Sequence, residues 1–510
     1  MEINLFTLLA SLPILLILIL MLALRWNAAR AGVAGWLCAI IVAIWGFGSG
    51  ARLLGYAHAK ALLLTLDVLL IIWNAFLLYR VTDEAGTIRM LSELIPKITV
   101  DRGMQALLVG WAFASFLQGV GGFGVPTAVT APLMVGLGFH PVTAVAIPSI
   151  GHAWSVTFGS LASSFQALQS ATDFAWQDLA PASAAFLACA CLACGLAVAH
   201  LAGGWSSIRR NGVRILVMAA AMGGSQYLLA TIGLWSIAGL GGSTAGLAAG
   251  LLLASSPKGE RDKQPLWKPD RNLALTLSGY VSLVVITLII QIPAIYERLD
   301  LLAIRVAFPA LSTNLGFTTP AGYGRQIYLL RHAGSILAYS SALTYWLYCR
   351  TGLLERGSGR KIILSTVKRM TPSSFGILML VSMAVTMSHA GMTEALASGI
   401  AASVGGLYPF VSPWIGALGA FMTGSNTNSN VVFAQLQLRT AQVIGLSAPI
   451  ILAAQTAGGA LGSVIAPAKI IVGSLTAGLE GQEGHVLRRM SVYTILLVSL
   501  ISILAWISLV

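Results

Sequence analysis

Apolar runs of membrane-spanning length, separated by short polar turns, repeat along almost the whole chain. A helix needs about 20 apolar residues to cross a bilayer, and the sequence offers about twelve such runs. The predicted spans lie at about 5–24, 31–50, 57–79, 141–165, 180–201, 212–231, 233–254, 273–292, 327–348, 373–390, 446–478 and 490–509. The pattern therefore predicts an all-α polytopic membrane protein.

Two stretches interrupt this pattern where an unbroken helix is expected. The first, Phe116–Pro126, carries four glycines between apolar arms of about 14 residues, each too short to span. The second, Phe421–Asn430, carries six consecutive hydroxyl or amide side chains from Ser425 onward. Backbone that leaves a helix inside hydrocarbon is tolerated only where protein buries it or where it lines a cavity. We therefore predict two re-entrant helical hairpins, at about 103–139 and 409–443.

The span after each hairpin is itself interrupted. The span at 141–165 contains glycine and polar residues at Ile150–Gly159, and the span at 446–478 contains them at Thr456–Ser463 and again at Pro467. Glycine weakens a helix through added backbone freedom, and proline removes a hydrogen-bond donor. We predict a broken helix in each place, which would present polar groups deep in the membrane.

The same order of elements occurs in both halves of the chain. Each half has spans, a hairpin and a broken span, and a basic, proline-containing linker at 255–272 separates the halves. Broken elements in corresponding places of two halves are typical of transporters with inverted repeats. We predict an N-terminal repeat at 1–254 and a C-terminal repeat at 273–510, with an interfacial amphipathic helix at Thr87–Ile98.

The distribution of Lys and Arg predicts how the chain is oriented in the membrane. Charged residues make up 9% of the sequence, against about 25% in soluble proteins, and the mean hydropathy is +0.84. The net charge of +13 is explained by Lys and Arg gathered in cytoplasmic loops, so no nucleic-acid partner is predicted. This assignment places the N-terminus outside and makes the two hairpins enter from opposite faces. The first apolar run lacks a cleavage site and is predicted to be a span, in a multi-pass protein of the inner membrane.

No enzyme chemistry is indicated. The sequence contains none of the patterns GxxxxGK[ST], HExxH and GxSxG, which argues against ATP hydrolysis and against metal- or serine-dependent hydrolysis. Of the five cysteines, Cys189, Cys191 and Cys194 fall in an apolar run with no His or acidic residue within a turn. Small residues of this kind let helices approach closely. No cofactor and no metal site are therefore predicted.

Polar groups at the hairpin tips and helix breaks form the predicted substrate site. Helix N-termini present free N–H groups and a partial positive charge, which suits an anion. Glycines allow close backbone approach, and hydroxyl and amide side chains add donors. Tight helix packing and a polar external loop are the alternative explanations. The predicted substrate-binding residues are Gln118, Gly119, Gly121, Gly122, Phe123, Gly124, Ser155, Thr157, Ser425, Asn426, Thr427, Asn428, Ser429, Asn430, Gln455, Thr456, Gly458, Gly459 and Lys469.

Three ionisable residues within the predicted spans are candidate functional groups, because a charge is costly there and most often functional. His152, in the first helix break, is a candidate proton carrier because His titrates near neutrality; the alternative is a structural, hydrogen-bonded histidine. Asp67 is a second proton-coupling candidate, or it balances a cation. Lys469 could pair with the substrate or with Asp67, or it could extend to the membrane surface.

Two long motifs resemble those of the lactate permease family. One is QALLVGWAFASFLQGVGGFGVPTAVTAPLMVGLGFHP, from Gln105 to Pro141. The other comprises SPWIGALGAFMTGSNTNSN, LRTAQVIG and QTAGGALGSVIAP within Val411–Leu479. The resemblance implies import of small 2-hydroxymonocarboxylates, generally with protons. It also implies an elevator-type mechanism, in which SNT-bearing hairpins move in a transport domain against a scaffold. Elevator-type relatives are often homodimers.

Three departures from the family pattern fall at site positions. Gln118 stands where the family usually has Glu in EGAAGFG, and HAWSVTFG, at His152–Gly159, stands where it has NTAPVAFG. The segment GSVIAPAK, ending at Lys469, replaces GKMISPQS and displaces the lysine by about two helical turns. We hypothesise that His152 replaces the lost acid as proton carrier and that Lys469 offsets the substrate charge.

The sequence therefore predicts an elevator-type secondary active transporter that imports lactate or glycolate by proton symport. A transporter of another small organic anion, such as a dicarboxylate or sulfonate coupled to Na⁺, would keep the same fold and stays open. An anion channel or a membrane sensor is the alternative from another class. The predicted partners are a small organic anion, H⁺ or Na⁺, the lipid bilayer and, through the resemblance, a second copy of the chain.

Overall fold

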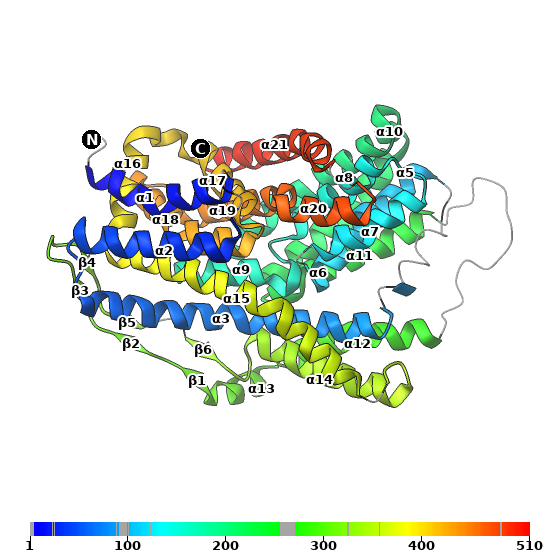
Figure 1. Cartoon of the computed structure of the whole chain (residues 1–510). Coiled ribbons are helices and arrows are strands. Elements are labelled where there is room, and N and C mark those ends of the chain that lie inside the picture. The colour runs from blue at the N-terminus through cyan, green and yellow to red at the C-terminus, as the bar shows by residue number, and fades with distance from the viewer. Residues whose placement is uncertain are drawn as a thin grey trace.

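Helices form most of the structure and pack into one bundle (Figure 1). The computed structural model describes residues 5–22, 24, 26–87, 89–90, 99, 101–122, 124–254, 271–290, 292–323, 326–355, 357–479 and 482–509. Most of the predicted interfacial helix at Thr87–Ile98, most of the linker at 255–272 and the site candidate Phe123 lie outside these residues.

A layer of long apolar helices forms one side of the bundle. In it, α3 (Ala51–Glu84) and α15 (Ser358–His389) run side by side (Figure 1). On this pair pack α2 (Ala28–Trp45), which contacts α15, and α14 (Ala333–Thr351), which contacts α3. The first helix, α1 (Leu5–Leu22), packs on α2. The layer thus joins the beginning of the chain to segments far away in the sequence.

The first predicted hairpin consists of two helical arms that pack against each other. The first arm combines α5 (Arg102–Gln105), a π-helical segment at Ala106–Phe113 and α6 (Ala114–Val120). The chain then turns back into α7 (Val125–Gly136). Trp111 and Phe113 of this arm are among the largest fully buried side chains, so the hairpin lies inside the protein.

The prediction that both arms are too short to cross a membrane is wrong for the first arm. Arg102–Val120 is 19 residues long and has the length and composition of a membrane span. The helix continues past Gly119 because this glycine packs against the backbone of Leu240. Close packing of that kind offsets the low helix propensity of glycine.

The second predicted hairpin has the same form. Its arms are α17 (Tyr408–Thr423) and α18 (Asn426–Ile444), which pack on each other. Gly424 ends α17 in the left-handed conformation, with φ +74°, which glycine adopts without steric cost. The tip is therefore a tight turn of two residues, Gly424 and Ser425.

The span after the first hairpin is broken, as predicted. It consists of α8 (Pro141–Gly151), a 3₁₀ turn at Ala153–Ser155 and α9 (Gly159–Thr172). Three successive non-glycine residues at the start of α9, Ser160–Ala162, have positive φ values of 46°, 54° and 60°. Each such residue brings its Cβ close to the following carbonyl oxygen, so this turn is strained.

The span after the second hairpin is also broken, and of the two predicted places the break occurs at the second, directly before Pro467. Helix α19 (Ala448–Gly462) continues through the glycines that were expected to end it, and the break is the 3₁₀ turn at Ser463–Ile465 before α20 (Pro467–Thr476). Gly458 and Gly462 lie directly against the backbone of α17. These glycines serve helix packing, and Pro467 begins the next helix.

The remaining helices follow predicted spans, except those at Pro293–Arg298 and Met392–Val404, which no predicted span includes. The longest, α10 (Trp176–Thr231), contains two predicted spans and bends at Gly203–Gly204, whose backbone angles are not helical. The other helices are α11 (Ala238–Ala254), α12 (Arg271–Ile290), α13 (Pro293–Arg298), α16 (Met392–Val404) and α21 (Glu483–Ile507), with 3₁₀ turns at Trp235–Ile237, Leu299–Leu301 and Gly405–Leu407.

A thin antiparallel ribbon follows α13, and its last strand takes the first two residues of the predicted span at 327–348. Its strands are β1 (Ala303–Ile304), β2 (Ala307–Phe308), β3 (Leu311–Ser312), β4 (Thr318–Thr319), β5 (Gly322–Tyr323) and β6 (Ile327–Tyr328). They pair as β1 with β6, β2 with β5 and β3 with β4. Near the tip, Asn314 N–H donates to the Gly48 carbonyl oxygen at 2.9 Å, which fixes the ribbon to the turn between α2 and α3.

The number of membrane crossings is bounded rather than fixed. In the described parts of the chain, eight helices are long and apolar enough to cross a membrane, or nine if the pair Leu277–Ile290 and Ala294–Leu301, bent by 82°, counts as one span. Helices α1 and α2 are apolar but shorter. Twelve spans therefore stay a prediction.

Candidate functional site

The tip of the second hairpin meets both broken helices in a buried polar centre. Asn426, at the start of α18, donates through Nδ2 to Thr157 Oγ1 at 3.1 Å and to the carbonyl oxygen and Oγ1 of Thr456 at 3.1 and 3.2 Å. The two threonine Oγ1 atoms are 3.2 Å apart. This contact joins α18 and α19 to the break between α8 and α9, so it brings together residues from both halves of the chain.

Asn430, one turn farther along α18, extends the centre to α9. Its Nδ2 donates to the carbonyl oxygen of Ser164 and to Thr456 Oγ1, each at 2.9 Å. Thr427 Oγ1 and Ser164 Oγ are 3.1 Å apart. All four residues are buried. Ser164, which the sequence analysis did not single out, therefore fixes α9 to the hairpin tip.

Two helix N-termini are buried close to the tips of the hairpins. Ser425 caps α18, because its side chain accepts a hydrogen bond from Asn428 N–H at 3.4 Å. Gly124, with φ +88°, precedes α7, and Pro126 occupies the first turn of that helix, where the missing N–H costs nothing. Free N–H groups and the helix dipole make such ends suitable for an anion.

Two buried side-chain oxygens in the centre have no partner in the described protein. These atoms are Asn426 Oδ1 and Asn430 Oδ1, on residues that are 1% and 0% exposed. Because the Nδ2 groups of both residues already donate to protein atoms, these amides can offer only acceptors to a ligand. An unsatisfied buried acceptor costs about 1–3 kcal/mol. The centre is therefore suited to a ligand that also carries a donor.

Other predicted site residues hold the helices together. Ser429 Oγ donates to the Gly416 carbonyl oxygen at 2.8 Å and accepts from Gln455 Nε2 at 3.1 Å. Gln437 Nε2 donates to Gln455 Oε1 at 2.8 Å, and Tyr408 OH donates to Gln437 Oε1 at 2.6 Å. This chain of bonds ties α17, α18 and α19 to one another and gives Ser429 and Gln455 a structural role.

Some of the predicted site glycines allow close helix packing, and others allow a backbone turn. An added Cβ would overlap the Pro413 carbonyl oxygen at Gly458 and the Asn426 side chain at Gly459, and it would lie 2.9 Å from the Tyr79 ring at Gly121. In contrast, Gly122 and Gly124 have positive φ values, 55° and 88°, which the turn between α6 and α7 requires. Gln118, beside this turn, is 4% exposed.

His152 lies at the first helix break, and Lys469 lies in the first turn of α20, just after the second break. His152 Nδ1 is 2.6 Å from the Pro148 carbonyl oxygen, so Nδ1 carries the hydrogen, and Nε2 has no partner in the described protein. Ser155 Oγ donates to the His152 carbonyl oxygen at 2.9 Å. Lys469 Nζ donates to Ser463 Oγ at 3.1 Å, and its charge lies within electrostatic range of His152.

Asp67 is buried midway along α3 and receives hydrogen bonds from two helices. Oδ2 accepts from Gln166 Nε2 at 2.7 Å and from Ser170 Oγ, both on α9. Oδ1 accepts from Nε2 of His332 at 2.9 Å. His332 Nδ1 accepts from Gly334 N–H at 3.1 Å, so the ring hydrogen resides on Nε2. The pairing of Asp67 with Lys469 is therefore wrong, since Asp67 pairs with His332 at the start of α14.

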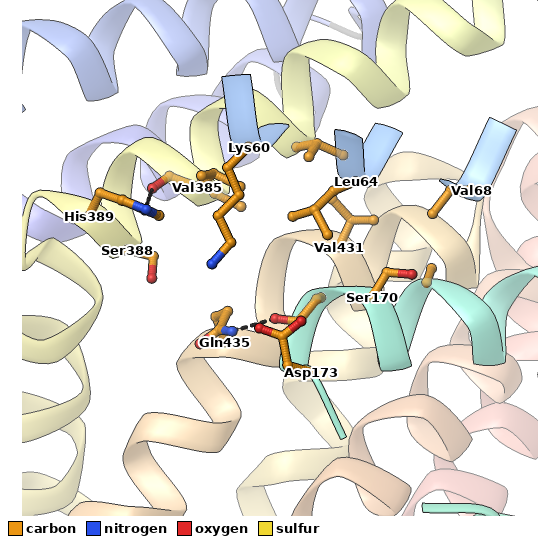
Figure 2. Close-up of a pocket in the computed structure, with 14 residues that line it drawn as sticks. Lys60, Leu64, Val68, Ser170, Asp173, Val385, Ser388, His389, Val431 and Gln435 are labelled. Carbon is orange, nitrogen blue, oxygen red and sulfur yellow. Dashed lines mark hydrogen bonds between the residues drawn. The ribbon is translucent and has the colours of Figure 1, made fainter. Parts of the chain in front are cut away.

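A cavity lies beside this carboxylate, between α3 and α15 on one side and α9 and α18 on the other (Figure 2). The volume open to the centres of water-sized molecules is about 40 Å³, which is room for about three waters, so the cavity is small. One end of the cavity is lined by Val68, which follows Asp67 in the sequence, and by Ser170, which donates a hydrogen bond to Asp67. None of the residues that line it was predicted as a site residue.

The structure thus assembles most of the predicted polar residues but adds partners that the sequence analysis missed. Gln166 and Ser170 are four residues apart and so share one helix face, but both lie beyond the predicted end of the span at residue 165, past which α9 continues to Thr172. His332 is 265 residues from Asp67 in the sequence, and no local pattern links the two.

Known proteins match nearly the whole chain. The family model described as L-lactate permease covers residues 6–510. The chain is 25% identical to glycolate permease GlcA of Escherichia coli K12, over 98% of this chain and 94% of that protein. It is 26% identical to the L-lactate permeases of Salmonella typhi and Bacillus subtilis, over 94% of this chain and 92% of each relative.

A solved structure has a similar fold. The Alcanivorax borkumensis YdaH transporter aligns with a TM-score of 0.50 and 14% identity, over 94% of this chain and 98% of that chain. At this identity the likeness concerns the fold alone. The family match, in contrast, includes both hairpins and both broken helices. The chain therefore belongs to the L-lactate permease family, whose members are membrane transporters and not enzymes.

Proposed function

We propose that the protein is a secondary active transporter that imports a small 2-hydroxymonocarboxylate, lactate or glycolate, by proton symport. The observation that carries this proposal is the buried polar centre, where the tip of α18 is bonded to the broken helices of both halves. Relatives along nearly the full length are L-lactate and glycolate permeases, which supports the substrate class.

The donors and acceptors of the centre suit a hydroxy acid. The N-termini of α7 and α18 attract a carboxylate, whereas Asn426 Oδ1 and Asn430 Oδ1 can accept a hydrogen bond from a hydroxyl group. A 2-hydroxy acid carries both groups on adjacent carbon atoms. In this proposal Gln118, Gly122, Gly124 and Thr157 surround the carboxylate end.

Asp67 is the proton carrier in this proposal. Its carboxylate is buried at the middle of α3 and is bonded to Ser170, which lines the cavity. Protonation removes a buried charge, and such intramembrane carboxylates are frequent members of proton relays. His152 is the second candidate, because its unpartnered Nε2 offers a lone pair for a proton.

An elevator-type movement of inverted repeats, 1–254 and 273–510, fits this arrangement. Each hairpin packs on the broken helix that follows it, while α3, α14 and α15 form a separate layer beside them. Twelve crossings, an even number, would place both ends of the chain on the same side of the membrane. The homodimer stays a prediction that the mass of the solubilised protein checks.

Uptake into proteoliposomes tests the proposed function. Labelled lactate and glycolate would be supplied outside, with and without an inward proton gradient, and with Na⁺ replaced by K⁺. We expect uphill accumulation that needs the proton gradient and not Na⁺. Competition by unlabelled dicarboxylates and sulfonates identifies the anion class.

Three other results would contradict the proposal. Accumulation that requires Na⁺ would indicate that the asparagine oxygens hold a cation and that the coupling ion is Na⁺. Flux that neither saturates nor proceeds uphill would indicate a channel. Saturable binding without flux would indicate a sensor.

A further inference from the structure

We propose that the cavity in Figure 2 is a second anion-binding site, in which Lys60 binds the carboxylate of a small monocarboxylate before it reaches the polar centre. This inference deepens the proposed transport function and rests on it for the identity of the ligand. It adds a cation that neither the sequence motifs nor the family resemblance pointed to.

Lys60 supplies the positive charge of the cavity. It lies seven residues before Asp67 on α3, about two helical turns away and therefore on a similar face. Figure 2 shows its side chain extending from α3 into the cavity, with Ser388 to one side and Gln435 ahead of it. Among the residues that the structure describes, the Lys60 ammonium has no hydrogen-bond acceptor and no ion-pair partner.

The neighbouring polar groups leave this charge without a partner. Asp173, the carboxylate among the described residues that line the cavity, is solvent-exposed at the end of α9 and forms no ion pair with Lys60. His389 Nδ1 is 3.0 Å from the Val385 carbonyl oxygen, and Gln435 Nε2 donates to the Ala171 carbonyl oxygen. A partly buried cation without a counter-charge is unfavourable, so this position favours a bound anion.

The rest of the wall selects the class of anion. The side chains around the lysine are aliphatic, chiefly Leu64, Val68, Val381, Val385 and Val431. One cation in such a wall can neutralise one carboxylate and bury a short carbon chain beside it. A second carboxylate would be buried against aliphatic groups without a partner, at a high cost. The cavity therefore fits a monocarboxylate better than a dicarboxylate.

The cavity borders both the polar centre and the proposed proton carrier. Val431, in its wall, directly follows Asn430 on α18, and Ser170, also in its wall, donates to Asp67. The same cavity would bring the anion and the proton to neighbouring groups.

Transport kinetics of Lys60 variants test this site. In proteoliposomes under a fixed proton gradient, we expect Lys60→Met to raise the KM for lactate or glycolate at least tenfold while the maximal rate changes less than twofold. Lys60→Arg, which keeps the charge, should stay within threefold of the unmodified protein. Lys368→Met is the matched control, because Lys368 is exposed on α15 away from the cavity, and it should leave the KM unchanged. An unchanged KM in Lys60→Met would overturn the proposal.

A binding measurement separates failure of this site from failure of the proposed function. Acetate, propionate, lactate and glycolate would be titrated against the purified protein in detergent while its thermal unfolding midpoint is followed, since a ligand of the folded state raises that midpoint. We expect stabilisation of the unmodified protein and of Lys368→Met, and at least a tenfold higher half-saturating concentration for Lys60→Met. Equal stabilisation of all three, or none of any, would overturn the site even if transport is observed. Stabilisation without uptake would refute the transport function alone.

A substitution of Asp173 tests the competing role of Lys60 as an ion-pair partner. If Lys60 serves the anion, Asp173→Asn removes a repelling charge from the cavity, and the KM should fall or stay the same. If Lys60 serves Asp173 in another state of the transporter, Asp173→Asn should raise the KM as Lys60→Met does. That result would contradict the proposal.

Discussion

Asp67 and His152 differ in their surroundings, and this difference predicts which of them carries the proton. Asp67 receives hydrogen bonds from α9 and from His332 and adjoins the cavity through Ser170. We expect Asp67→Asn to abolish uphill accumulation driven by a proton gradient but to preserve exchange of labelled for unlabelled substrate, because exchange needs no net proton movement. Counterflow and gradient-driven uptake in the same vesicles measure both.

His152→Gln is the comparison for this prediction. The residue bonds to the backbone of its own helix and lies outside the cavity wall, so proton-driven accumulation should remain. The assignment would be reversed if His152→Gln lost accumulation while Asp67→Asn kept it.

The hydrogen bonds of the Asn426 amide predict that an aspartate destabilises the protein at residue 426 but not at residue 428. Asn426→Asp replaces a donor that faces Thr157 Oγ1 and the Thr456 carbonyl oxygen by an acceptor. We expect a loss of about 1–3 kcal/mol in unfolding free energy, measured as a lower unfolding midpoint. Asn428→Asp is the matched change two residues away. It places an acid in the first turn of α18, where the helix dipole favours it, and a comparable drop there would contradict this account.

At the scale of elements, small residues decide how close α17 and α19 approach. A Cβ at Gly458 would overlap the Pro413 carbonyl oxygen, so Gly458→Ala should destabilise the protein by about 1–3 kcal/mol. Gly224, exposed on α10 with nothing within 4 Å of an added Cβ, is the control. Gly224→Ala should stabilise by about 0.5–1 kcal/mol. Unfolding midpoints of the two variants test the contrast, and equal shifts would show that close approach does not matter here.

Most elements could be predicted from periodicity and from breaks in it. Both hairpins and both broken helices were predicted, because glycine, proline and polar runs change local backbone energy directly. The additional break expected at Thr456–Ser463 is nearly absent, because α17 packs on Gly458 and Gly462 and keeps them helical. A glycine in contact with another helix has the same sequence appearance as one in a turn.

The site could be predicted only in part for a similar reason. Asn426, Asn430, Thr157 and Thr456 were predicted because they interrupt apolar segments, and the structure brings them together. His332 could not be predicted, since its contact with Asp67 depends on how α14 packs on α3. Tertiary contacts of this length have no local signature.

At the scale of the whole molecule, the charge pattern predicts which end faces the cytoplasm. The bend of α10 at Gly203–Gly204 leaves Trp205 72% exposed, and the tip of the ribbon leaves Leu315 53% exposed. In a variant without its five cysteines, Leu315→Cys should react with a membrane-impermeant maleimide on intact cells. Trp205→Cys should react only after the cells are opened. The reverse pattern would invert the predicted orientation, and reaction of both on intact cells would exclude an odd number of crossings between them.

The left-handed turn at Ser160–Ala162 has a consequence for the energy of the transporter. Each non-glycine residue in that conformation costs about 1–2 kcal/mol, so the turn stores roughly 3–6 kcal/mol, a considerable part of the 5–15 kcal/mol by which a typical protein is stable. The second hairpin restrains it, through Asn430 and Thr427 on Ser164. The hairpin tip therefore holds this strained turn in place. Withdrawal of the tip of α18 would remove this restraint, and the turn at the start of α9 could then relax toward the right-handed conformation.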